Sequence, residues 1–164
     1  MLRFVQRSKP YHIEGVPDWM ASLLHSRGVS TREEAEAYLR PSYEHLHDPM
    51  LMQNMERAVA LIKDAISKKQ RAVVYGDYDV DGMCASALLC ETLKSMGLKT
   101  IVYIPDRHSE GYGLSSGAIE KLAPQAELLI SVDCGITSVE EVRFAKSMGM
   151  TVILTDHHTP PDKL

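Results

Sequence analysis

Beyond Arg71, short apolar runs alternate with longer segments whose apolar residues recur at helical spacing. Runs rich in Val, Ile and Leu that alternate with such segments predict βαβ units and a parallel sheet. The predicted strands are 72–75, 100–104, 128–132 and 151–154, and the predicted helices between them are 83–96, 115–122 and 138–148. Gly97 and Gly149 follow two of these helices as expected C-terminal stops. The pattern therefore predicts an α/β fold of three layers, with helices on both faces of the sheet.

The first part of the chain predicts helices and connectors. Apolar positions from Met55 to Ile66 follow the i, i+3, i+4, i+7 stripe of an amphipathic helix. Ser30 and Glu33 have the spacing of a capping box, and Pro41 forbids extension of the helix that they begin. We expect a helical lead-in over 1–50 and the α/β domain over 51–164. Thr137 and Glu140 predict a second capping box, at the helix before Met148.

Composition narrows the class of protein. The 164 residues are 45% hydrophobic, which suits a globular domain, and no apolar run approaches the roughly 18 residues of a membrane span. The start lacks the apolar stretch of a secretory signal, so a cytoplasmic protein without membrane contact is expected. Three cysteines without a Cys-x-x-Cys pair are expected to be reduced packing residues. The net charge of −4 argues against a purely electrostatic nucleic-acid binder.

Acidic residues and histidines follow the ends of all four predicted strands. The first strand ends in Gly-Asp-Tyr-Asp-Val-Asp-Gly, residues 76–82. The later strands are followed by Asp106, Arg107 and His108, by Asp133, and by Asp156, His157 and His158. Parallel strands open onto one edge of a sheet, where α/β proteins bind ligands. We therefore expect these side chains to gather in one polynuclear metal site.

Two other interpretations of the aspartates at 77, 79 and 81 compete with a metal site. A solvated acidic turn is one, because Asp and Gly are common loop residues. An EF-hand loop is excluded because its twelfth position, counted from Asp77, is Leu88 rather than Glu, and because a strand precedes it. Mixed carboxylate and imidazole ligands suit Mn²⁺ and tolerate Mg²⁺. Two such ions can activate water and clamp a phosphoryl group, which predicts hydrolysis of a phosphate ester or anhydride.

The Gly-rich loop at 110–114 predicts a contact with substrate. It carries one aromatic ring, Tyr112, beside Arg107 and His108. The helix expected to begin near Met83 directs its free amides to the same edge of the sheet, which favours a bound anion. We expect a substrate-facing lid in which the binding residues are Arg107, His108, Gly111, Tyr112 and His158.

Four motifs resemble those of the DHH phosphoesterase superfamily. They stand at 76–82, 104–114, 132–136 and 155–158, in the family's order, and 46–49 also resembles the lead-in of its RecJ branch of single-strand-specific 5′-to-3′ DNA exonucleases. The resemblance implies metal ligation by Asp77, Asp79, Asp81, Asp133 and His157, with Asp133 as the bridge between two Mn²⁺ ions. It implies that His158 contacts the scissile phosphate and that Asp156 orients its neighbours. Arg107 is a further proposal for a phosphate contact.

Relatives of this kind supply a further aspartate from a later strand and a C-terminal domain, whereas the sequence stops at Leu164. The expectation is therefore an N-terminal portion of the catalytic core, truncated before the C-terminal domain, with weak metal affinity and little or no nuclease activity. Single-stranded DNA is the expected partner of the longer parent, and a single-strand-binding protein or a helicase is a further candidate. Open alternatives are hydrolysis of short oligonucleotides, cyclic dinucleotides or pyrophosphate, and a non-catalytic replication or repair scaffold. A phosphatase of the Asp-x-Asp-x-Thr kind leaves the histidine pair unexplained.

Overall fold

The computed structural model describes residues 9–161, which form two compact units. The first extends to Gln53 and the second begins at Asn54. Within the described residues, the first unit has one buried apolar cluster and the second unit has two. The boundary falls just before the amphipathic helix that begins at Met55.

The first unit is a small helical unit. It contains α1 (Asp18–His25), α2 (Arg32–Leu39) and two 3₁₀ turns, η1 (Tyr43–His45) and η2 (Pro49–Leu51). Its core is formed by Ile13, Ala21, Leu24 and Ala35.

The capping box of α2 lies one residue later than the sequence pattern predicts. Thr31, not Ser30, is the N-cap, and its hydroxyl accepts from the Glu34 amide. The Glu34 carboxylate accepts from the amides of both Ser30 and Thr31. The predicted pairing of Ser30 with Glu33 is wrong because the Ser30 hydroxyl instead bonds the His25 ring.

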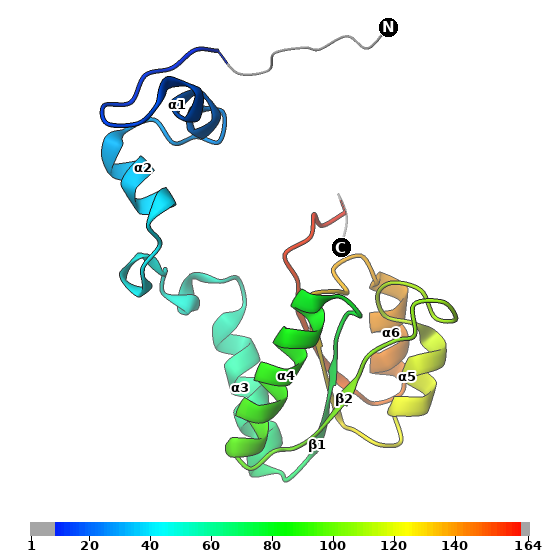
Figure 1. Cartoon of the computed structure of the whole chain (residues 1–164). Helices are drawn as coiled ribbons and strands as arrows, with labels where there is room; N and C mark the ends of the chain where they lie inside the picture. The colour runs from blue at the N-terminus through cyan, green and yellow to red at the C-terminus, as the bar shows by residue number, and fades with distance from the viewer. Residues whose placement is uncertain (1–8, 162–164) are drawn as a thin grey trace, which may run out of the picture. The chain divides into compact units, whose positions relative to one another are not determined.

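The second unit is a three-layer α/β domain (Figure 1). Its elements are α3 (Met55–Ser67), β1 (Arg71–Tyr75), α4 (Val80–Ser95), β2 (Lys99–Tyr103), α5 (Ser116–Leu122), β3 (Leu128–Val132), α6 (Val139–Ser147) and β4 (Thr151–Thr155). The strands are all parallel and stand in the order β2-β1-β3-β4. The predicted parallel sheet is confirmed.

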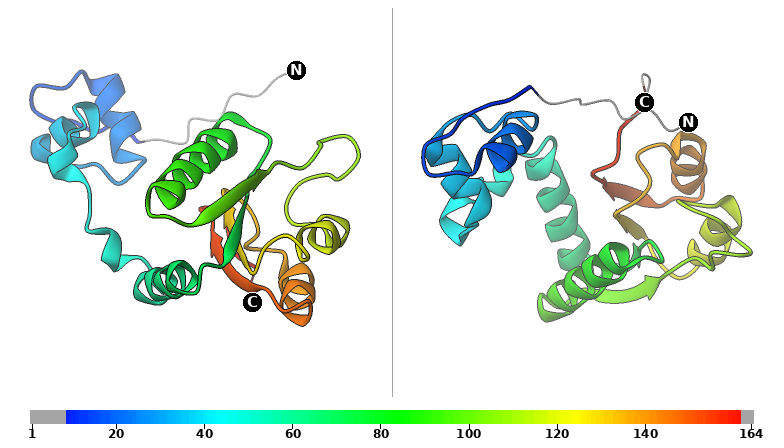
Figure 2. Two further views of the ribbon diagram at one scale, coloured as in Figure 1. Left: turned by 90° about the horizontal axis from the view of Figure 1, so that it is seen from below. Right: turned by 45° about the horizontal axis from the view of Figure 1, so that its top comes forward.

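Helices cover both faces of this sheet. Figures 1 and 2 show α3 and α4 on one side and α5 and α6 on the other. Successive residues of β1 alternate between the two cores: Val74 belongs to the core that includes Leu93 of α4, and Val73 belongs to the core that includes Ile119 of α5. Because both faces are buried, β1 and β3 are apolar at almost every position.

Two helix beginnings differ from the sequence expectation. Helix α4 starts at Val80 rather than Met83, because the Asp79 carboxylate accepts from the Gly82 amide and caps it. Helix α6 starts after Ser138 without any side-chain cap, so the predicted capping box of Thr137 and Glu140 is wrong. A tight turn precedes α6, in which the Ser138 amide donates to the Gly135 carbonyl. The helix ends agree with prediction, since Gly97 and Gly149 both have positive φ directly after their helices.

The direction of the connections reverses between β1 and β3. The chain leaves β1 for β2 on one side and then crosses to β3 on the other side of β1. Such a reversal separates the connections at the carboxyl ends of the two strands, and ligands of open α/β sheets bind there. The segments that begin at Gly76 and Asp133 follow these two strand ends. Among residues 9–161, no helix is long and apolar enough to cross a membrane.

Candidate metal centre

The segment after β1 places two aspartates against the start of α4. Asp77 is 4% exposed, and a Cβ added to Gly82 would lie 2.7 Å from the Asp77 backbone. Only glycine lets the first turn of α4 approach so closely. Burial raises the pKa of Asp77, and the nearby charges of Asp79 and Asp133 raise it further. A cation among these carboxylates would remove that repulsion.

Asp133 follows β3 in an uncommon backbone conformation, with a φ of 61°. Aspartate tolerates this left-handed region better than most residues. The turn is fixed by the Asp133 amide, which donates to the Thr155 carbonyl, and by the Ser131 hydroxyl, which donates to the Cys134 carbonyl. The Cys134 thiol is fully buried and its pKa is raised to about 12, mainly by burial. It is a neutral packing residue, as its lack of an activating pattern suggested.

The segment after β4 orients an imidazole through a buried carboxylate. Asp156 accepts from the amides of Ile136 (2.9 Å) and His158 (3.0 Å), and from His158 Nδ1 (2.7 Å). Burial opposes ionisation of Asp156, but these hydrogen bonds outweigh it and lower its pKa. The bond to Asp156 in turn raises the pKa of His158. Because the carboxylate accepts, Nδ1 carries the proton and Nε2 is the nitrogen that can face a ligand.

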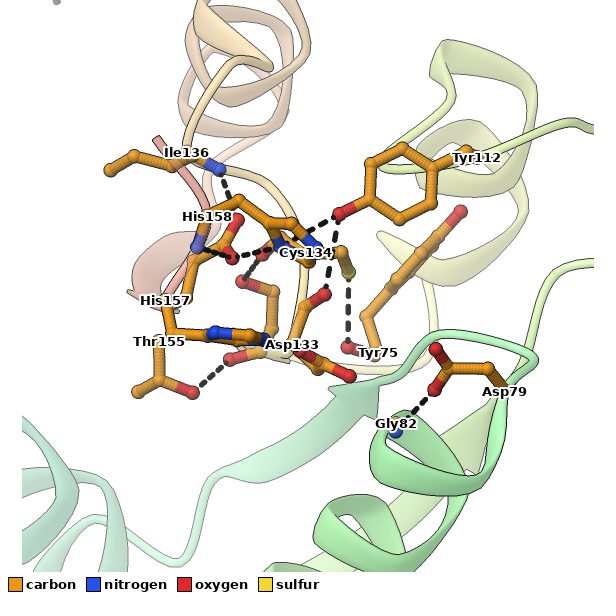
Figure 3. A network of polar contacts seen from close by, with 12 residues as sticks. Tyr75, Asp79, Gly82, Tyr112, Asp133, Cys134, Ile136, Thr155, His157 and His158 are labelled. Carbon is orange, nitrogen blue, oxygen red and sulfur yellow. Dashed lines mark hydrogen bonds and ion pairs between the residues drawn. The ribbon is translucent and has the colours of Figure 1, made fainter. Parts of the chain in front are cut away.

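Tyr112 connects the loop after β2 to this imidazole. Its hydroxyl lies 3.1 Å from His158 Nδ1 and 3.4 Å from the Asp133 carbonyl oxygen (Figure 3). Burial and the surrounding carboxylates raise the pKa of Tyr112 to about 12, so the phenol stays neutral. Tyr112 therefore lies beside His158 as a neutral hydrogen-bonding partner.

Two groups of potential metal ligands share one aspartate. One group is Asp77, Asp79 and Asp133, and the other is Asp133, His157 and His158. Within each group, one ligand atom per residue lies within 4.8 Å of the others. His157 Nε2 is also 3.0 Å from Asp133 Oδ1. Oxygen-rich groups with added imidazole fit Mn²⁺ or Mg²⁺ better than a thiolate-preferring metal.

Other predicted site residues lie outside these two groups. Asp81 is exposed in the first turn of α4, and its role as a metal ligand stays a prediction without matching geometry. Asp106 does not reach the groups, because its carboxylate accepts from the amides of His108 and Ser109 in its own loop. His108 and Gly111 are exposed in the same loop.

The comparison with known proteins decides the family. Residues 71–164 match the model of the DHH family, N-terminal domain. The chain belongs to the DHH family. The chain is similar to the single-stranded-DNA-specific exonuclease RecJ of Bacillus subtilis (strain 168), at 40% identity over 146 residues. The RecJ of Escherichia coli (strain K12) is 36% identical over 151 residues.

Solved structures agree with this assignment. A crystal structure of exonuclease RecJ bound to manganese matches with a TM-score of 0.65 at 37% identity, over 68% of this chain and 29% of that one. RecJ from Thermus thermophilus in complex with Mn²⁺ matches 94% of this chain and 23% of that one with a TM-score of 0.65, at 24% identity, which supports the fold alone. The Bacillus match spans 88% of this chain but 19% of that relative, and the Escherichia match spans 91% of this chain but 26% of that relative.

Three features of the DHH domain were not predicted from the sequence. The Ile136 amide holds Asp156, which no side-chain pattern could reveal. The Glu110 carboxylate accepts from the Tyr103 hydroxyl and the Asp106 amide and so braces the loop. Tyr78, between the two aspartates, lies under the Arg107 guanidinium. The sequence offered one indication that Tyr78 has a role, which is its position as an aromatic residue between two aspartates.

Proposed function

We propose that this chain is the N-terminal part of the catalytic core of a metal-dependent exonuclease that hydrolyses phosphodiester bonds of single-stranded DNA from the 5′ end. The observation that carries the proposal is the sharing of Asp133 between two groups of potential metal ligands. A shared carboxylate is the arrangement expected for a pair of divalent ions in phosphoryl chemistry. Identities of 40% and 36% to proteins named as single-stranded-DNA-specific exonucleases support the substrate class.

Mn²⁺ is the proposed cofactor, with Mg²⁺ as the alternative. Asp77, Asp79, Asp133 and His157 would hold the ions, and Asp81 is retained as a weaker candidate. When bound, two divalent ions supply an activated water and neutralise charge on the phosphate. Their +4 charge would also offset the acidic character of the site, which otherwise repels DNA.

The chain's own residues then have separate proposed roles. Asp156 keeps His158 in one orientation and one protonation pattern, so that Nε2 can contact the scissile phosphate. Tyr112 limits rotation of the same ring through its hydroxyl. Arg107, which lies outside the ligand groups, is proposed to contact a second phosphate.

The test is a comparison of ligands for the 164-residue chain in the presence of Mn²⁺. We expect a single-stranded oligonucleotide to bind more tightly than duplex DNA, pyrophosphate or a cyclic dinucleotide, and we expect Asp133→Asn to remove the Mn²⁺ dependence. Tighter binding of pyrophosphate or a cyclic dinucleotide would reassign the substrate. Oligonucleotide binding that does not depend on Mn²⁺ would favour the alternative of a non-catalytic scaffold. Little or no turnover of 5′-labelled DNA is expected from this chain, and partnership with a single-strand-binding protein or helicase stays a prediction.

A further inference from the structure

Tyr78 and Arg107 join two loops beside the candidate metal centre. The Cζ atom of Arg107 lies 5.3 Å from the centroid of the Tyr78 ring, within the range of a cation–π contact. Tyr78 follows β1 between Asp77 and Asp79, two members of one ligand group. Arg107 follows β2. The Tyr78 ring therefore contacts a positively charged side chain from the loop that follows the neighbouring strand.

The hydrogen-bond donors of Arg107 are not used by a carboxylate in the described part of the chain. Arg32, Arg71 and Arg143 each pair with a glutamate. Within residues 9–161, Arg107 forms no ion pair, although two aspartates flank the ring beneath it. A planar guanidinium with free donors suits bidentate binding of a phosphate. Stacking on a ring keeps those donors available.

The loop around Arg107 is fixed by its own acidic residues. Asp106 Oδ1 accepts from the amides of His108 (3.1 Å) and Ser109 (2.9 Å). Glu110 Oε2 accepts from the Asp106 amide at 3.0 Å, and its Oε1 accepts from the Tyr103 hydroxyl. These contacts fix the backbone on both sides of Arg107. They do not determine the direction of the Arg107 side chain, which the contact with the Tyr78 ring can fix.

We propose that Tyr78 is a positioning residue that holds the Arg107 guanidinium ready for a phosphate group of the substrate. The proposal rests on the proposed function, because it needs a phosphate-bearing ligand at the metal centre. A side chain that is ordered beforehand loses less conformational freedom when the ligand binds. If the contact were ordinary surface packing, ligand affinity would not depend on the ring.

The position of Arg107 can be tested without any ligand by NMR spectroscopy of its side chain. We expect ring-current shifts of the Arg107 side-chain signals in the wild-type chain. Tyr78→Phe keeps the aromatic face and should preserve these shifts, whereas Tyr78→Leu should abolish them. Shifts that are absent from the wild-type chain, or unaltered in Tyr78→Leu, would overturn the proposal.

Binding of a single-stranded oligonucleotide with Mn²⁺ tests the consequence. Tyr78→Leu should weaken binding about two- to fivefold, the size of one cation–π contact at a partly exposed site, and Tyr78→Phe should restore it. In an Arg107→Ala background, Tyr78→Leu should cause no further loss. Tyr43→Leu, an exposed tyrosine of the first unit, is the matched control and should change nothing.

The outcomes separate the two proposals. If the wild-type chain binds the oligonucleotide and Tyr78→Leu binds equally well, the role of Tyr78 is overturned and the proposed function stands. An additive loss in the double variant would also overturn it, because Tyr78 would then act independently of Arg107. A wild-type chain that binds no oligonucleotide would contradict the proposed function, and the NMR shifts would still decide whether Tyr78 holds the guanidinium.

Discussion

Asp133 has an uncommon backbone conformation and is also a potential metal ligand. Its φ of 61° is needed for the turn after β3, and its carboxylate belongs to both ligand groups. Asparagine tolerates the same backbone region but carries no charge. Substitution by asparagine can therefore separate metal binding from folding.

Asp133→Asn should lower Mn²⁺ affinity by at least about tenfold. Substitution of residues that only hydrogen-bond to metal ligands already lowers metal affinity about 10- to 100-fold, and Asp133 is a potential ligand itself. The free energy of unfolding without metal should stay equal or rise slightly, since one of the crowded carboxylates becomes neutral. Calorimetric titration and urea denaturation measure the two quantities. Unchanged Mn²⁺ affinity would remove Asp133 from the metal centre.

Asp79 also has two roles, as the N-cap of α4 and as a potential ligand. Asp79→Ala should lower the free energy of unfolding by about 1 kcal/mol, and Asp79→Ser should largely preserve it, because serine also caps helices. Both variants should weaken Mn²⁺ binding similarly. If Asp79→Ser binds Mn²⁺ like the wild type, the Asp79 carboxylate is a cap alone.

At the scale of elements, the period of apolar residues predicted every strand and helix of the second unit, because burial on two faces dictates that pattern. It placed the start of α4 three residues too late, since the pattern does not reveal that Asp79 caps the helix. The sequence also predicted Asp106 at the metal centre. In the structure, its carboxylate instead accepts a hydrogen bond from the Ser109 amide in its own loop. Cap choice and loop bracing depend on contacts between segments, which a periodic pattern does not contain.

The close approach of α4 to the β1 loop predicts a strong effect at one glycine. In Gly82→Ala the new Cβ would lie 2.7 Å from the Asp77 backbone, so the helix start must shift. We expect a loss of about 1 to 3 kcal/mol in the free energy of unfolding and weaker Mn²⁺ binding. Gly117→Ala in α5 is the matched control, because nothing lies within 4 Å of its Cβ, and its stability should rise or stay unchanged. Equal stabilities for the two variants would contradict the close packing.

An ion pair joins the beginnings of β1 and β3. Glu127 accepts from the Arg71 guanidinium and amide, and these contacts lower the pKa of Glu127 to about 2. A depressed pKa stabilises the fold above the ordinary value of 4.5, and this contribution disappears as the pH falls towards 2.

Glu127→Gln should therefore reduce the free energy of unfolding at pH 7 by about 1 kcal/mol, a figure that allows for solvent screening of a partly exposed pair. The difference from wild type should shrink between pH 4.5 and 2, as measured by urea denaturation across that range. Glu140→Gln, which removes an exposed pair within α6, should have a smaller effect at every pH. A difference for Glu127→Gln that does not depend on pH would exclude the electrostatic explanation.

At the scale of the whole domain, the strand order explains why residues far apart in sequence meet. The connections reverse between β1 and β3, so the segments after these two strands meet at one edge of the sheet, and the segment after β4 adds its histidines beside β3. The sequence could predict this convergence because parallel strands share one edge. The sequence could not predict which carboxylates would instead accept hydrogen bonds from helix N-termini or from loop amides.

The most direct test is an anomalous-difference map from crystals of the chain grown with Mn²⁺. We expect peaks at both ligand groups, with Asp133 bonded to each ion and His157 bonded to one. A map with Mn²⁺ peaks elsewhere, or with none in reach of Asp79, Asp133 and His157, would contradict this expectation.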